Sequence, residues 1–229
     1  MQQEIIDAPD FGMLKITFDQ PGEKVVSEAG AMVAMGTEID ISTNMRGGLL
    51  AAAKRAVMGG ESLFQNTYTA KAPNQALFLS PPSEGDLRAL ALGPGQTFFL
   101  QSGAYVAHVG DQLVLDTKWG GVKSFFGGVG FFMLKVVGPG TVYYATYGAI
   151  HEVDVNPQMG YTVDTGHIVG FTEGLNFNIR KFGGYKGLFF SGEGLVCDFQ
   201  GQGKVYVQTR NPGSLASFLE AYRPVKSSS

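Results

Sequence analysis

The stretch Gly30-Ala31-Met32-Val33-Ala34 decides the fold, because the chain repeats its pattern twice. It returns as Gly103-Ala104-Tyr105-Val106-Ala107 and as Gly166-His167-Ile168-Val169-Gly170, so that matching glycines lie 73 and 63 residues apart. A Gly-Gly pair begins 17 residues after each leading glycine, at Gly47, Gly120 and Gly183. Repeats of this length predict three related supersecondary units that bury a shared core.

Extended apolar segments surround each copy. The residues 24–28, 97–101 and 161–164 alternate in the manner of strands and end just before the repeated glycine. A second strand follows the glycine, and a third is predicted at 39–42, 113–116 and 175–179. Hairpins are indicated by Gly138-Pro139-Gly140 and Gly201-Gln202-Gly203, while the first copy turns at 71–74.

These patterns predict an all-β protein whose 229 residues form a single compact unit. We place the three modules at about 10–92, 93–156 and 157–212, with an extra strand in each of the linking stretches 85–93 and 148–157. A short helix is expected near 49–58, where strong helix formers gather. A second helix, near 214–222 within the segment 213–224, would be capped by Ser214 and would cover the open edge of the last module. The residues 225–229 are expected to be a frayed tail.

The Gly-Gly segments are the candidate functional regions. The windows 46–60, 118–130 and 180–190 hold 8 of the 17 basic residues and none of the 20 acidic ones, so they carry a formal charge of +8 within a chain of −3. They are also rich in apolar and aromatic side chains. The candidate interface residues are Arg46, Leu49, Leu50, Lys54, Arg55, Lys118, Trp119, Lys123, Phe125, Phe126, Lys186, Phe189 and Phe190.

Several interpretations of these windows stay open. Their apolar residues could be core, with basic side chains reaching outward to water. They could form a protein–protein interface, including one of self-association. Basic residues set among aromatics also suit an anionic membrane surface or a single-stranded nucleic acid. We expect a non-enzymatic interaction or assembly scaffold whose first-choice partner is a protein or a second copy of the chain, with an anionic membrane surface as a further partner. A module that binds RNA or a small ligand in a cleft between repeats is the alternative function.

Catalytic motifs are missing from the sequence. His108, His151 and His167 lack metal-ligand spacing, no Gly-x-Ser-x-Gly elbow is present, and Gly201-Gln202-Gly203-Lys204 lacks the Walker spacing. The single cysteine, Cys197, is expected to be a small buried hydrophobe. We therefore expect a protein without enzymatic activity, cofactor or metal. The first residues lack a signal-peptide pattern and no run reaches membrane-spanning length, so the expected location is the cytoplasm.

The whole chain, over about residues 10–222, resembles a bacterial family of uncharacterised proteins related to the fungal mitochondrial biogenesis protein named for altered inheritance of mitochondria. The resemblance rests on Gly30-Ala31-Met32, on Met58-Gly59-Gly60-Glu61-Ser62-Leu63-Phe64 and on Gly93-Pro94-Gly95. It implies an all-β assembly of modules similar to the tryptophan RNA-binding attenuator protein fold, an open relative of the double-stranded β-helix. It implies no established enzyme activity and no agreed ligand. The association of fungal relatives with the mitochondrial inner membrane agrees with a scaffold or membrane-surface role.

Overall fold

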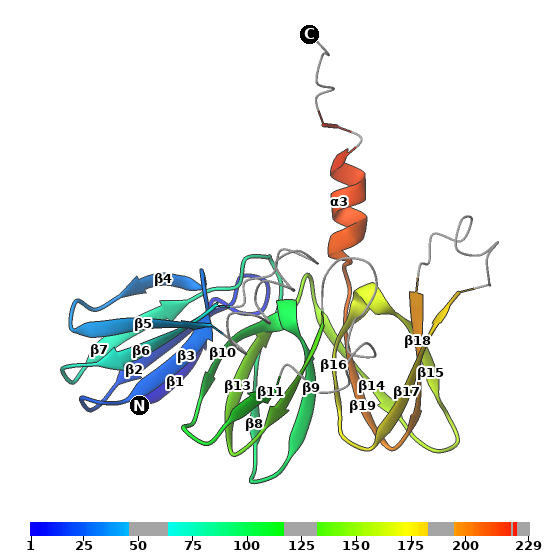
Figure 1. The fold of residues 1–229 in the computed structure, drawn as a ribbon. Coiled ribbons are helices and arrows are strands. Elements are labelled where there is room, and N and C mark those ends of the chain that lie inside the picture. Colours follow the sequence, from blue (N-terminus) through cyan, green and yellow to red (C-terminus); the bar gives the residue numbers. More distant parts are fainter. Residues whose placement is uncertain (46–63, 117–131, 183–194, 221, 224–229) are drawn as a thin grey trace.

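The computed structural model describes residues 1–45, 64–116, 132–182, 195–220 and 222–223. Within these residues the chain is built from antiparallel β-strands, with one α-helix near the C-terminal end (Figure 1). The prediction of an all-β fold is therefore confirmed. The expected helix near 49–58 lies outside the described residues.

The strands after β1 (Gln2–Ile6) fall into three consecutive groups of six. The first group is β2 (Met13–Phe18), β3 (Lys24–Glu28), β4 (Met32–Met35), β5 (Ile39–Met45), β6 (Phe64–Ala70) and β7 (Gln75–Leu79). The second is β8 (Leu87–Leu92), β9 (Thr97–Gln101), β10 (Tyr105–Val109), β11 (Val114–Asp116), β12 (Met133–Val137) and β13 (Gly140–Ala145). The third is β14 (Ile150–Val155), β15 (Tyr161–Asp164), β16 (Ile168–Thr172), β17 (Leu175–Lys181), β18 (Leu195–Gly201) and β19 (Gly203–Gln208).

Each group pairs its strands in the same order. The first, sixth and third strands form one ladder, as in β8-β13-β10, and the second, fifth and fourth form another, as in β9-β12-β11. The extra strands predicted in the linking stretches are β8 and β14, and they pair with β13 and β19 of the group that follows them. The order of strand pairing is what recurs; an internal triplication, its module boundaries and the attenuator-protein-like fold stay predictions.

Neighbouring groups are joined by one recurring strand pair, which we call the joint. The second strand of one group pairs with the third strand of the next, as β3 does with β10 and β9 with β16. Each joint fuses two three-stranded ladders into a six-stranded sheet. The groups therefore follow one another in a row, with β4 and β15 at opposite ends of it (Figure 1).

The core follows the same division. Phe18, Tyr68 and Leu79 lie in a first cluster of buried side chains, Phe98 and Leu100 in a second, and Phe171 and Phe199 in a third. The strand β2 shows how a strand contributes to its cluster: every second residue, Leu14, Ile16 and Phe18, is fully buried. Because successive side chains of a strand point to opposite faces, the period-2 pattern of the sequence selects which face becomes core.

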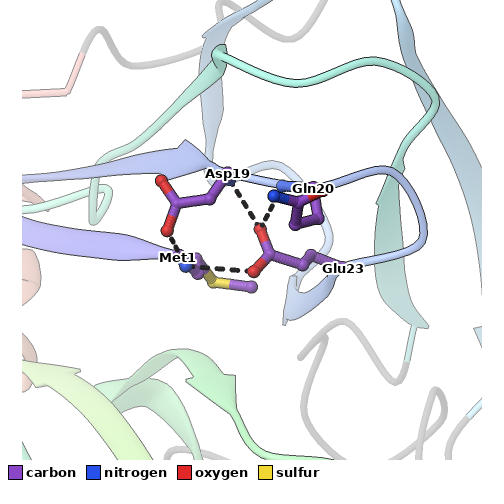
Figure 2. Close-up of polar contacts among 4 residues, drawn as sticks. All are labelled: Met1, Asp19, Gln20 and Glu23. Carbon is purple, nitrogen blue, oxygen red and sulfur yellow. Dashed lines mark hydrogen bonds and ion pairs between the residues drawn. The ribbon is translucent and has the colours of Figure 1, made fainter.

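The strand β1 covers the free edge of β2. The amino group of Met1 lies between the carboxylates of Asp19 and Glu23, at 3.0 Å from Glu23 Oε1 (Figure 2). Glu23 Oε2 also accepts the backbone N–H groups of Asp19 and Gln20, at 2.7 and 3.2 Å. The hydrogen bonds to Asp19 and Glu23 raise the pKa of the amino group. The two edge strands of this four-stranded sheet are β1 and β4.

The helix α3 (Pro212–Glu220) differs from its prediction in two ways. Asn211, rather than Ser214, caps it, since Asn211 Oδ1 accepts the N–H of Gly213 at 2.8 Å. The helix also buries none of its residues and projects away from the sheets (Figure 1). The expectation that it covers the open edge of the last module is therefore wrong. In the described part of the chain, no helix is long and apolar enough to span a bilayer.

Candidate functional site

The candidate interface residues of the basic-aromatic windows all lie outside the described residues, in 46–63, 117–131 and 183–194. What the structure does place is the strands on either side. Each window connects the fourth and fifth strands of its group: β5 to β6, β11 to β12 and β17 to β18. The pairing between the second and fifth strands begins at Glu28, Gln101 or Asp164, which hold the same position relative to the repeated glycine. The windows thus leave the sheets at equivalent points.

Two basic residues of the third window are described, and one of them is already ion-paired. Arg180 on β17 donates from Nε and Nη2 to the two carboxylate oxygens of Asp198, at 2.6 and 3.0 Å. Thr162 on β15 donates its hydroxyl to the same carboxylate at 2.6 Å. These bonds, led by that from Arg180, lower the pKa of Asp198. The three side chains tie β15, β18 and β17 together across one face.

We expect Asp198→Asn to make the free energy of unfolding depend less on pH in the acid range. A carboxyl whose folded-state pKa is depressed stabilises the fold above its unfolded pKa of about 3.9, and this stabilisation is lost as the pH falls through the folded value. The pair is partly exposed, so the stabilisation at neutral pH is about 0.5–1 kcal/mol. In urea unfolding, parent and variant should differ at pH 6 and converge near pH 2. A difference that is constant with pH would contradict this assignment.

The most unusual described surface is the edge of β4. Its Met32 and Val33 are 40% and 57% exposed. The equivalent Tyr105 and Val106 on β10 are 1% and 2% exposed, and Ile168 and Val169 on β16 are equally buried. Among the described residues, β10 and β16 each have a neighbouring strand on both sides, whereas β4 has only β7, and we attribute the difference in exposure to this.

The backbone of β4 is shaped like that of its two buried counterparts. All three strands carry a β-bulge at the same place, between Met32 and Ala34, between Tyr105 and Ala107, and between Ile168 and Gly170. The N–H of Gly36 donates to the Ala76 carbonyl on β7, at 2.8 Å. Since inward and outward groups alternate along an antiparallel strand, the N–H and C=O of Met35 face away from β7. They form part of an open hydrogen-bonding edge.

A hollow of about 350 Å³ adjoins the beginning of β4. Its walls are the segment 28–33, the turn Ser80-Pro81-Pro82 and Val106 of the second group. Glu28 is the one charged residue in that wall. A second hollow of about 400 Å³ lies between the second and third groups, and its one charged wall residue is Glu173. Both hollows are therefore ill suited to a phosphate-bearing ligand, which basic side chains recognise.

His108, His167 and Cys197 have structural surroundings. Nδ1 of His108 lies 2.7 Å from the Tyr105 hydroxyl, which donates to the Val26 carbonyl across the first joint. Nδ1 of His167 donates to the Gln208 carbonyl at 2.7 Å. Cys197 is fully buried, as predicted, and burial raises the pKa of its thiol to about 12. Within the described ranges, no three His, Cys, Asp or Glu side chains are grouped so as to hold a metal ion.

Sequence reasoning missed the β4 edge. Met32 and Val33 were used to recognise the repeat, and a repeated apolar strand is ordinarily taken as core. The available signal was the position of the copy: the first unit of a row has no preceding unit to cover it, so one of its repeated strands stays open.

A family model described as mitochondrial biogenesis AIM24 matches residues 3–210, which is most of the chain. The chain belongs to the AIM24 family. Among curated proteins, it is 28% identical over 224 residues to an uncharacterised protein of Streptococcus pyogenes serotype M6, covering 95% of this chain and 89% of that one. Among solved structures, it is similar to the X-ray structure of a Streptococcus pyogenes protein, with a TM-score of 0.77, 26% identity and coverage of 97% and 99%. The resemblance to the mitochondrial biogenesis family is thereby confirmed.

Proposed function

We propose that this AIM24-family chain is a non-enzymatic assembly protein that binds an extended protein segment along the edge of β4. The observation that carries the proposal is the exposure of Met32 and Val33, whereas the equivalent residues of β10 and β16 are buried in the core. An added strand would satisfy the outward backbone groups of β4 and cover these side chains, which is how strand addition binds peptides. No charged side chain on β4 opposes such pairing.

Site-specific photo-cross-linking in cells tests this function. A p-benzoyl-phenylalanine side chain replaces Val33, or in the control replaces Ile41, an exposed residue on the edge strand β5. The proposal expects a discrete protein adduct from position 33 and none of comparable yield from position 41. An absence of protein adducts at position 33 would overturn the proposal, because a strand paired with β4 must lie within reach of that side chain.

The basic-aromatic windows support a second role, contact with an anionic membrane surface. They hold no acidic residue, and they leave the sheets at equivalent points of the three groups. Clustered lysines and arginines beside aromatic residues are attracted to anionic headgroups, with about 1 kcal/mol for each basic residue near the surface.

Charge reversal at three of these lysines should weaken binding to anionic vesicles. At about 1 kcal/mol per lysine, the variant Lys54→Glu/Lys123→Glu/Lys186→Glu is expected to lose roughly a hundredfold in affinity at low salt. The matched control Lys15→Glu/Lys24→Glu/Lys135→Glu has the same net charge and should keep more of the parent's binding. Co-sedimentation with phosphatidylserine-containing vesicles measures both. Equal recovery of parent and window variant, each with an intact fold by circular dichroism, would exclude this role.

A small ligand or RNA in a cleft between repeats is the remaining alternative. The described hollows favour an apolar molecule over a polyanion, because acidic residues supply their charged wall groups. Fluorescence of Trp119, which belongs to the second window, distinguishes RNA binding from membrane binding when short RNA and anionic lipid are titrated in turn. A response to RNA but not to lipid would favour the alternative.

A further inference from the structure

We propose that β4 of one chain pairs with β15 of a second copy, so that the chains join head to tail through a third joint. This inference rests on the proposed function and names its partner. The joint already occurs twice within the chain, as β3–β10 and β9–β16. Two strands of the same class lack their joint partner: β4, the third strand of the first group, and β15, the second strand of the third group.

The two open edges cannot meet within one molecule. They lie at opposite ends of the row (Figure 1), and within the described part of the chain β15 pairs with β18 alone. The helix α3, which was expected to cover the last module, buries none of its residues and so does not cover this edge. Each chain therefore offers one copy of each half of the joint. Contacts of this kind are heterologous, and they produce closed rings or open filaments according to the rotation between copies.

The two existing joints also give the register of the third. Ala107 lies opposite Ser27 in the first joint, and Gly170 lies opposite Leu100 in the second. The equivalent positions are Ala34 on β4 and Val163 on β15, separated by the same repeat spacings of 73 and 63 residues. We infer that Ala34 lies opposite Val163 of the second copy, and Met35 opposite Thr162.

The backbone groups needed for this register are directed outward. In the segment of β3, the Ala70 N–H donates to the Glu23 carbonyl, so the backbone groups of Glu23 face β6. Because inward and outward backbone groups alternate, those of Val26 face β10. In the segment of β9, the Ser102 N–H donates to the Phe132 carbonyl, and by the same alternation the backbone groups of Phe99 face β16. Thr162 holds the equivalent position in β15, and its predicted partner Met35 is the β4 residue whose backbone groups face away from β7.

The side chains are compatible with the pairing. β4 carries no charged residue, and the one charged residue of β15, Asp164, accepts the N–H of Gly166 at 2.7 Å. Thr162 is held by Asp198, which fixes β15 on its own sheet before a partner arrives. Burial of Met32 and Val33 supplies an apolar contribution of the kind made by Tyr105, Val106 and their counterparts in the existing joints.

Light scattering coupled to size exclusion first measures the mass of the full chain. The parent should have the mass of two or more chains. Val33→Lys blocks the β4 edge with a charge, and Thr162→Pro removes an outward N–H from β15, so each variant alone should have the mass of one chain. Val114→Lys, at another exposed edge residue, and Thr162→Val, which loses the hydroxyl but keeps the N–H, should assemble like the parent. A parent of single-chain mass would overturn the inference.

Mixing the two blocked variants tests the direction of the joint. The Val33→Lys chain keeps an intact β15, and the Thr162→Pro chain keeps an intact β4, so the mixture should form a one-to-one dimer although neither component self-associates. Circular dichroism spectra that match the parent show that each variant is folded. Failure of the two folded variants to combine would rule out head-to-tail pairing.

A disulfide tests the register. In the inferred joint Ala34 and Val163 form a non-hydrogen-bonded pair, whose Cα atoms are about 4.5 Å apart, a separation that a disulfide can bridge. Ala34→Cys mixed with Val163→Cys should give an intermolecular disulfide on mild oxidation. The native Cys197 does not interfere, because it is buried. A disulfide between two Ala34→Cys chains would instead indicate β4–β4 pairing and contradict the register.

The outcomes separate this inference from the function on which it rests. Photo-cross-links from position 33 to a different protein, with an unassembled parent, would leave the assembly function standing and overturn the self-pairing. An absence of adducts at position 33 would remove both. Adducts that map to the β15 region of the same protein would support both together.

Discussion

Gly85→Ala is expected to destabilise the protein by about 4 kcal/mol, which corresponds to a fall in melting temperature of roughly 8–16 °C for a chain of this length. Gly85 lies where the linking segments cross, with bridges to Phe11 and Gly148. An added Cβ would lie 2.2 Å from the Thr146 carbonyl oxygen and 2.5 Å from that of Gly148. Both neighbours are backbone atoms, so the clash cannot be relieved by rotation of a side chain. Thermal unfolding followed by circular dichroism measures the effect.

Gly22→Ala is the matched control. Gly22 also has a positive φ, of 89°, but its added Cβ would meet no atom within 4 Å. The control therefore measures the strain of a positive φ without a clash, about 1 kcal/mol, and the larger loss at Gly85 includes the clash with the two carbonyl oxygens. Equal melting temperatures for the two variants would show that the crossing can move apart, and would contradict the tight packing of 85 against 146–148.

Phe98→Ala is expected to cost about 3–5 kcal/mol. Phe98 is fully buried, and its ring centroid lies 5.3 Å from that of Tyr206 and 5.8 Å from that of Tyr144. Its ring also lies beside Gly170, opposite β9 in the second joint. Removal of the ring leaves a cavity between the second and third groups, because the flanking backbones are fixed by their ladders. Urea unfolding monitored by circular dichroism gives the change in unfolding free energy.

The control for this variant is Phe11→Ala, which removes the same ring from a side chain that is 71% exposed. Its unfolding free energy should stay within about 0.5 kcal/mol of the parent value. A loss at Phe98 no larger than that at Phe11 would mean that the joint between the second and third groups contributes little to stability.

Strand positions were predictable from local pattern. The segments 24–28, 97–101 and 161–164 coincide with β3, β9 and β15, because alternation with period 2 and the following glycine mark both the strand and its end. The C-terminal helix was predictable in type but not in its first turn. Asn211 and Ser214 are both good caps, and the choice between them depends on where the preceding strand releases the chain.

The position of each strand in a sheet was not predictable in this way. Val33, Val106 and Val169 occupy the same place in the same motif, yet one is exposed and two are buried. Nothing local to the three valines differs enough to cause this. The strand of Val106 is hydrogen-bonded to β3 and that of Val169 to β9, whereas among the described residues the strand of Val33 has no such neighbour. These strand pairs join residues that are far apart in the chain.

The sequence by itself therefore determined the all-β class, the strands and the recurring Gly-Gly segments, because each depends on side-chain order over a few residues. Only the tertiary structure decided which edges are closed and which are open. A joint forms only when one group supplies a second strand and the next supplies a third. Within the described residues, the first group therefore keeps one open edge on β4 and the last keeps one on β15. The candidate assembly surface is a consequence of that row, and no single copy of the repeat contains it.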